Sequence, residues 1–214
     1  MNLWWFIIKG GPVMIPIIFG SIIGLALIIE RIFVFKKTRI DNRLFMQEIE
    51  QLVKRGEIQM AITTCEVEPG PIADVVKAGL TSYSASAAEG DINFAMQSEG
   101  NAQIGRLEKG LTGLGIIVTI EPMLGFLGTI VGLIQAFMNW EKMGANISIN
   151  LLAAGMYAAM ITTAAGLIIA IPYYIAYNWF VKKVQDIAKE MDQAHTKLLQ
   201  LLGNHKNAKT KINV

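Results

Sequence analysis

The fold is decided by the stretch from Gly110 to Trp140, GLTGLGIIVTIEPMLGFLGTIVGLIQAFMNW, in which Glu121 is the single charged residue. A helix rises about 1.5 Å per residue, so about 20 apolar residues cross the roughly 30 Å hydrocarbon core of a bilayer. Two further stretches, residues 10–29 and 143–181, contain no charged residue. The sequence therefore predicts an all-α membrane protein with three transmembrane helices.

Charged residues are concentrated in two other parts of the chain. Of the 19 basic and 17 acidic residues, 20 lie between residues 36 and 109 and ten lie after residue 181. We expect an interfacial segment at 1–11, transmembrane helices at 12–35, 111–139 and 150–181, a cytoplasmic helical domain at 36–110, an outer loop at 140–149, and a cytoplasmic C-terminal helix and tail at 182–214.

Lysine and arginine residues orient these segments. The outer flanks hold one basic residue each, Lys9 and Lys142. Seven basic residues instead follow the first and third spans closely: Lys36, Lys37, Arg39, Arg43, Lys182, Lys183 and Lys189. Because cytoplasmic flanks of membrane helices are rich in lysine and arginine, we place residues 36–110 and the tail in the cytoplasm and the N-terminus outside.

The first apolar run is interpreted as a retained anchor. A cleaved signal peptide is the alternative, but its apolar region spans about 7–15 residues and ends at an Ala-x-Ala site, which is absent here. The break at Gly10-Gly11-Pro12 predicts that residues 1–11 lie along the outer membrane surface, with Trp4 and Trp5 at the interface. The alternative is that they lengthen the first span.

Composition excludes several classes of protein. The net charge is +2, with no basic face, so no nucleic-acid partner is expected. Cys65 is the one cysteine and no Cys/His cluster is present, so we expect no disulfide and no metal. The chain contains no phosphate-binding loop, HExxH motif or nucleophile elbow, so we expect no enzyme, catalytic residue or cofactor. His195 and His205 are expected to be solvated.

Helical periodicity continues in the cytoplasmic segment. It predicts helices over residues 40–54, 57–67, 71–83 and 87–111, separated at Gly56, at Pro69-Gly70-Pro71 and near Ser84. The apolar positions of these helices suit helix packing.

Small residues are frequent in the second and third spans. Small side chains let membrane helices approach closely. The positions assigned to helix packing are Gly125, Gly128, Gly132, Gly155, Ala158 and Gly166.

Four polar residues in these spans are the candidate ion pathway: Glu121, Thr129, Thr162 and Thr163. Glu121 lies roughly 15 Å from the cytoplasmic end of its span by helical rise. Intramembrane carboxylates usually face a bundle interior or water and mark ion paths. The spans run antiparallel, so Thr129 and Thr163 are expected within about one turn of each other in depth. The alternatives are a threonine that bonds only its own helix and a protonated, structural Glu121.

Two motifs in the spans resemble those of the ExbB/TolQ/MotA proton-channel family. Residues 115–137, GIIVTIEPMLGFLGTIVGLIQAF, are similar to the family's second span, and residues 158–178, AAMITTAAGLIIAIPYYIAYN, to its third. The run from Gly56 to Leu80 resembles the ExbB branch. Three spans also favour ExbB or TolQ over the four-span MotA.

The resemblance implies a function. Family members form homopentameric rings in the bacterial inner membrane around the single-span helices of two ExbD- or TolR-like partners, whose aspartate carries protons. The outer side of the membrane is then the periplasm. By motif position, Thr129 and Thr163 are the threonines that line this aspartate's surroundings. Ion flow drives a TonB- or TolA-like effector that spans the periplasm.

The sequence departs from the family at two positions. Many ExbB proteins carry a glutamate where this chain has Ala158, and Glu121 occupies a position that is usually alanine or serine. We therefore hypothesise that Glu121 faces the central pore and takes over part of the ion relay.

Two other functions remain open. One is a membrane scaffold that conducts no ions and clusters partners through its cytoplasmic helices. The other is a sodium-driven motor of the same architecture, because threonine hydroxyls and free carbonyls suit hard cations.

Overall fold

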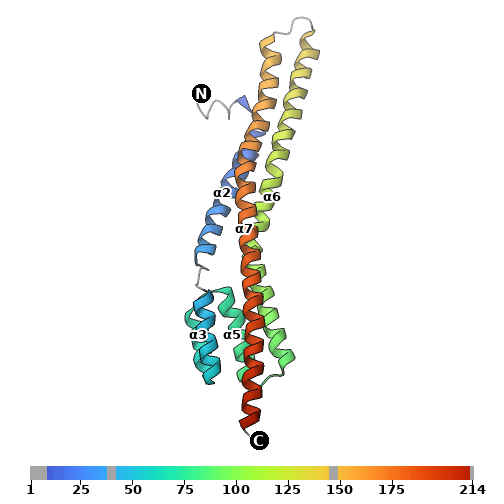
Figure 1. Ribbon diagram of the computed structural model, residues 1–214. Coiled ribbons are helices and arrows are strands. Elements are labelled where there is room, and N and C mark those ends of the chain that lie inside the picture. Colours follow the sequence, from blue (N-terminus) through green and yellow to red (C-terminus); the bar gives the residue numbers. More distant parts are fainter. Residues whose placement is uncertain (1–8, 38–41, 145–148, 213–214) are drawn as a thin grey trace. The chain divides into compact units, whose positions relative to one another are not determined.

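The computed structural model describes residues 9–37, 42–144 and 149–212, and within these ranges it contains helices and turns but no strand. The predicted all-helical class is confirmed. The segments predicted at 1–11 and 140–149 lie partly outside the described residues. The helices are α2 (Met14–Lys37), α3 (Asn42–Arg55), α4 (Ile58–Val67), α5 (Pro71–Ser84), α6 (Glu89–Met143) and α7 (Ile149–Ile212) (Figure 1).

Helices α2, α6 and α7 are each long and apolar enough to cross a membrane, as predicted. Their outward faces carry large apolar side chains. The exposed fractions of Ile15, Phe19, Phe126 and Ile168, for example, lie between 64% and 71%. Soluble proteins rarely expose large contiguous apolar patches, whereas lipid is a good solvent for them.

The chain divides into two compact units. Unit 1 consists of Met1–Arg31 and Gly110–Phe180, and unit 2 of Ile32–Lys109 and Val181–Val214. Helices α6 and α7 therefore contribute to both units. Both contain a proline, Pro122 and Pro172 respectively, and both continue through it without a break. Membrane helices tolerate such prolines because neighbouring groups satisfy the freed carbonyls.

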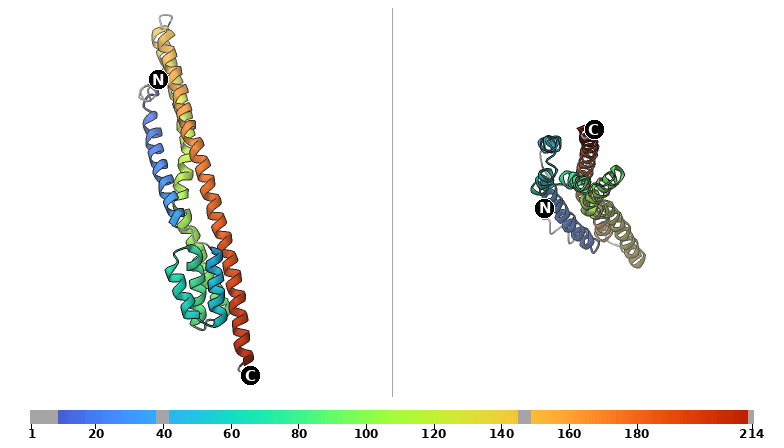
Figure 2. Two further views of the ribbon diagram at one scale, coloured as in Figure 1. Left: turned by 60° about the vertical axis from the view of Figure 1, so that its left-hand side comes forward. Right: turned by 90° about the horizontal axis from the view of Figure 1, so that it is seen from below.

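In unit 1, α2 lies beside the apolar parts of α6 and α7 (Figures 1 and 2). A small core joins the three helices. Met14 and Ile17 of α2 pack with Ile161 of α7, and Leu124 of α6 packs against them.

Unit 2 is built like a water-soluble domain, with apolar side chains inside. Its helices α3, α4 and α5 agree with the predicted ranges to within three residues. Side chains from α3, α4, α5, α6 and α7 form one core, which includes Ile49, Cys65, Val76, Met96 and Leu198. Burial raises the pKa of the Cys65 thiol to about 12.

The turn after α3 explains why Gly56 ends this helix. Gly56 has φ +79°, a conformation that suits glycine because it has no Cβ. Its N–H donates to the carbonyl of Val53, and the N–H of Glu57 donates to the carbonyl of Leu52, each at 3.0 Å. This pair of bonds is the Schellman motif that closes many helices.

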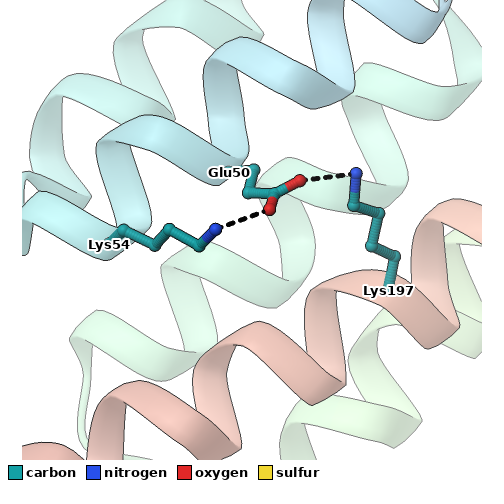
Figure 3. Close-up of polar contacts among 3 residues, drawn as sticks. All are labelled: Glu50, Lys54 and Lys197. Carbon is teal, nitrogen blue, oxygen red and sulfur yellow. Dashed lines mark hydrogen bonds and ion pairs between the residues drawn. The ribbon is translucent and has the colours of Figure 1, made fainter.

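An ion-pair network joins α3 to α7 on the surface of unit 2 (Figure 3). The carboxylate of Glu50 accepts from Lys54 Nζ at 2.8 Å and from Lys197 Nζ at 2.7 Å. The hydrogen bond from Lys197, and then that from Lys54, lower the pKa of Glu50 from 4.5 to about 2.

This network predicts a specific pH dependence. Because the folded pKa lies below the unfolded one, the stabilisation by Glu50 is complete above about pH 4.5 and is lost as the pH falls towards 2. We expect Glu50→Gln to lower the melting temperature slightly at neutral pH and to match the wild type near pH 2. Circular dichroism of the full chain in detergent measures this. Glu48→Gln, which changes an exposed residue of α3, is the matched control and should melt like the wild type at every pH.

The two histidines are less exposed than predicted. His205 is half-buried, and its Nδ1 forms a hydrogen bond of 2.9 Å with the hydroxyl of Tyr83. His195 is also half-buried, and its Nε2 is enclosed without a hydrogen-bond partner. The prediction of solvated histidines was wrong because one face of the tail helix packs into the core of unit 2.

Candidate functional site

Direct contact between main chains brings α6 and α7 together in unit 1. A Cβ added to Gly132 of α6 would lie 2.9 Å from the nitrogen of Ala159 and 2.9 Å from the oxygen of Gly155 on α7. Real Cβ atoms do not come so close to backbone. Glycine is therefore required at position 132 by the approach of the two helices.

The other predicted packing residues extend this contact. A Cβ added to Gly125 would lie 3.0 Å from the main-chain oxygen of Thr162. One added to Gly155 would lie 2.8 Å from Cβ of Ala136, and one added to Gly166 would lie 2.6 Å from the main-chain oxygen of Glu121. Gly128 faces the side chain of Thr162. Ala158 is half-buried, and its carbonyl accepts a hydrogen bond from Thr162.

Thr129 and Thr163 meet across this contact. Their hydroxyls form a hydrogen bond with each other, which confirms the expectation that they lie at similar depth. Thr163 Oγ1 also lies 3.0 Å from the carbonyl oxygen of Gly125, and Thr129 Oγ1 lies 3.2 Å from that of Ala159. Each threonine thus reaches the opposite helix, and both side chains are half-buried.

The two hydroxyls cannot make all these bonds at once. Each hydroxyl holds one hydrogen and can accept others. Thr129 can donate to Thr163 while Thr163 donates to Gly125, or Thr163 can donate to Thr129 while Thr129 donates to Ala159. Rotation of the hydroxyls exchanges the two arrangements. The hydrogen bond between the two hydroxyls can therefore reverse its direction, and in either arrangement a hydroxyl oxygen can still accept a further hydrogen bond inside this apolar region.

Thr162 differs from this pair. It is 1% exposed, and its hydroxyl lies 3.1 Å and 2.9 Å from the carbonyls of Ala158 and Ala159 on its own helix. Its side chain packs against Gly128. This geometry matches the alternative in which a membrane threonine bonds its own helix.

Glu121 lies at the junction of all three helices of unit 1. The residue is 1% exposed. Its Oε1 lies against Gly20 of α2, and its main-chain oxygen lies against Gly166 of α7. Its Oε2 has no hydrogen-bond partner. An ionised carboxylate in such surroundings costs about 2.5–3.5 kcal/mol or more.

The predicted pore-facing position of Glu121 stays a prediction. Within the chain, the carboxyl packs against α2. The sequence motifs lie in α6 and α7, whereas Gly20 lies in α2, so the sequence does not indicate this contact.

Contacts of α2 were the main part of the site that the sequence did not predict. The hydroxyl of Tyr173 donates to the carbonyl of Ser21 at 2.7 Å, and the Tyr173 ring covers Gly24. The sequence signal for this contact is Tyr173 itself, a side chain with a polar hydroxyl inside an apolar span.

Glu30 and Arg31 follow the first charge-free run, and from the sequence they are expected to form a boundary ion pair that snorkels to the cytoplasmic surface. They do form an ion pair, with 2.6 Å between Oε1 and Nη2. The prediction that this pair snorkels to the surface was wrong for Arg31. Arg31 is 5% exposed and its guanidinium covers Gly110, where an added Cβ would lie 2.7 Å from Cζ. The glycine makes room for the buried cation.

The described residues contain no group of three or more His, Cys, Asp or Glu side chains that could hold a metal ion. The candidate site consists of the hydrogen-bonded threonine pair and the buried Glu121 carboxyl.

Comparison with known proteins gives a family match. The model of the MotA/TolQ/ExbB proton channel family matches residues 67–193, which is more than half of the chain. This range includes the threonine pair, Glu121 and much of unit 2.

Individual relatives carry names from the same family. An ExbB-like 3 biopolymer transport protein of Synechocystis is 26% identical over 173 residues, which cover 80% of this chain and 81% of the relative. An ExbB-like 1 protein of the same organism is 30% identical over 171 residues, 77% of this chain and 65% of the relative. Biopolymer transport protein ExbB of Neisseria gonorrhoeae is 34% identical over 98 residues, 45% of this chain and 44% of the relative. The chain thus spans less than two thirds of the second and third relatives.

Proposed function

Because the chain belongs to the MotA/TolQ/ExbB proton channel family, a family of membrane energy-transducing subunits, we propose that it is the ring-forming subunit of a proton-driven motor. It assembles as a homopentamer in the bacterial inner membrane, around a dimer of ExbD- or TolR-like single-span subunits. The motor does work on a TonB- or TolA-like effector, for energised outer-membrane transport or envelope maintenance. The N-terminus is periplasmic, and unit 2 is cytoplasmic.

The observation that carries this proposal is the threonine pair. A passive anchor gains nothing from two hydroxyls that reach across a helix contact and can reverse their hydrogen bonds. Such hydroxyls suit the surroundings of a titrating carboxyl, because they can donate to its charged form and accept from its neutral form. The partner's span aspartate supplies that carboxyl.

A single chain cannot enclose a path for ions. Its three apolar helices pack around each other and leave large apolar side chains exposed on their outer faces. Part of these faces contacts lipid, and part contacts neighbouring copies. This arrangement supports a ring-like homo-oligomer.

Proton flux tests the proposal. The chain and its single-span partner are co-purified and reconstituted in vesicles that contain a pH-sensitive dye, and a membrane potential is applied. We expect proton uptake with both subunits and none with either subunit alone. An assembled complex that carries no flux would contradict the motor and support the scaffold. Flux that follows sodium at fixed pH would indicate a sodium-driven motor.

A further inference from the structure

The carboxyl of Glu121 closes the contact between α2 and the other two helices of unit 1. Oε1 and the α carbon of Gly20 are so close that no Cβ fits between them. On the opposite side, a Cβ added to Gly166 would lie 2.6 Å from the main-chain oxygen of Glu121. Both neighbouring helices therefore have a glycine where they meet this residue.

No charged group compensates this carboxyl within the described residues. Gly20 of α2 faces the carboxyl, Gly166 of α7 lies against the main-chain oxygen of the same residue, and Oε2 has no hydrogen-bond partner. The titratable group of α7 that reaches α2 is Tyr173, and its hydroxyl donates to Ser21. The charged residues in the part of α2 that belongs to unit 1, Glu30 and Arg31, pair with each other.

We propose that Glu121 is a proton-binding site of this chain, and that its protonation holds α2 against α6 and α7. The neutral acid fits the apolar junction. When the proton leaves to water, the carboxylate has two acceptor oxygens and no donor, so water must enter beside Gly20 and loosen the contact of α2. A metal cation fits the site less well, because hard cations take several oxygen ligands and Oε1 lies against a glycine methylene.

Modification with an apolar carbodiimide tests proton binding. The reagent adds to protonated carboxyls in apolar surroundings, and mass spectrometry of the full chain in vesicles locates the adduct. We expect labelling at Glu121, none at the ion-paired Glu30, and a rate that falls about tenfold per pH unit once the carboxyl ionises. A rate independent of pH, no adduct at Glu121, or protection by sodium at fixed pH would each overturn the proposal.

Cross-linking tests the contact of α2. A Cβ at Gly113 of α6 would lie 3.3 Å from Cδ1 of Leu27 on α2, about two turns from Glu121. The pair Leu27→Cys and Gly113→Cys should cross-link well at low pH and several-fold less, in about the proportion of ionised Glu121, as the pH rises. With Glu121→Gln added, the yield should stay high. Because Gln cannot ionise, it also corrects for the pH dependence of thiol chemistry. Equal pH profiles in the two backgrounds would overturn the proposal.

Both experiments need neither a partner subunit nor ion flux. Their failure would leave the motor function untouched, and absence of flux would leave the proton site untouched.

Discussion

Replacement of Gly132 by leucine is expected to separate α6 and α7 and to abolish stable folding of unit 1. The Cβ alone would lie 2.9 Å from backbone atoms of Gly155 and Ala159, and backbone cannot move aside as a side-chain tip can. Overpacking of a core costs about 1–3 kcal/mol even where side chains yield. We expect Gly132→Ala to lower thermal stability in detergent and Gly132→Leu to accumulate poorly in the membrane.

The matched control is Gly105, which lies in the same helix. A Cβ added there meets nothing within 4 Å. Gly105→Ala should keep or raise stability, by up to about 1 kcal/mol, because alanine is the better helix former. Equal stability of Gly132→Ala and Gly105→Ala would show that the α6–α7 contact is looser than described.

Loss of either hydroxyl of the threonine pair is expected to lower ion-driven activity strongly while the proposed ring still assembles. Valine keeps the shape of threonine but cannot donate. An unsatisfied buried polar group costs about 1–3 kcal/mol, or roughly ten- to a hundredfold in an equilibrium. We therefore expect Thr163→Val and Thr129→Val each to lower proton flux at least about tenfold. Vesicle flux at equal amounts of assembled complex measures this.

Thr162→Val is the control for this experiment. Thr162 bonds carbonyls of its own helix, so its loss should change flux little. Thr163→Ser restores the hydroxyl and should restore most of the flux. If all three valine variants lose flux equally, helix packing and not the hydroxyl pair is responsible.

The helices of this protein were predictable because their signals are local. Runs with at most one charged residue mark α2 and the apolar parts of α6 and α7, whereas Gly56 marks the end of α3 and Pro71 the start of α5. The similar depth of Thr129 and Thr163 followed from helical rise alone. Thr162 was grouped with them because adjacent residues on a helix have the same depth, whereas the direction of a side chain depends on the neighbouring helix.

The contacts of α2 were not predictable in the same way. The burial of Glu121 against Gly20 and of Arg31 against Gly110 depends on the rotation of α2 about its axis. An almost uniformly apolar helix does not encode that rotation in a periodic pattern. The same limit applies to His195, because the pattern of the tail did not indicate which face packs into unit 2.

The burial of Cys65 determines how the chain responds to thiol reagents. A thiol with a pKa of about 12, enclosed in the core of unit 2, is almost never a thiolate at neutral pH, and the thiolate is the reactive form. The natural chain therefore behaves as a background without reactive cysteine. Fluorescent or spin labels attached at introduced cysteines on α2 and α6 will report on those sites alone, with the native core left intact.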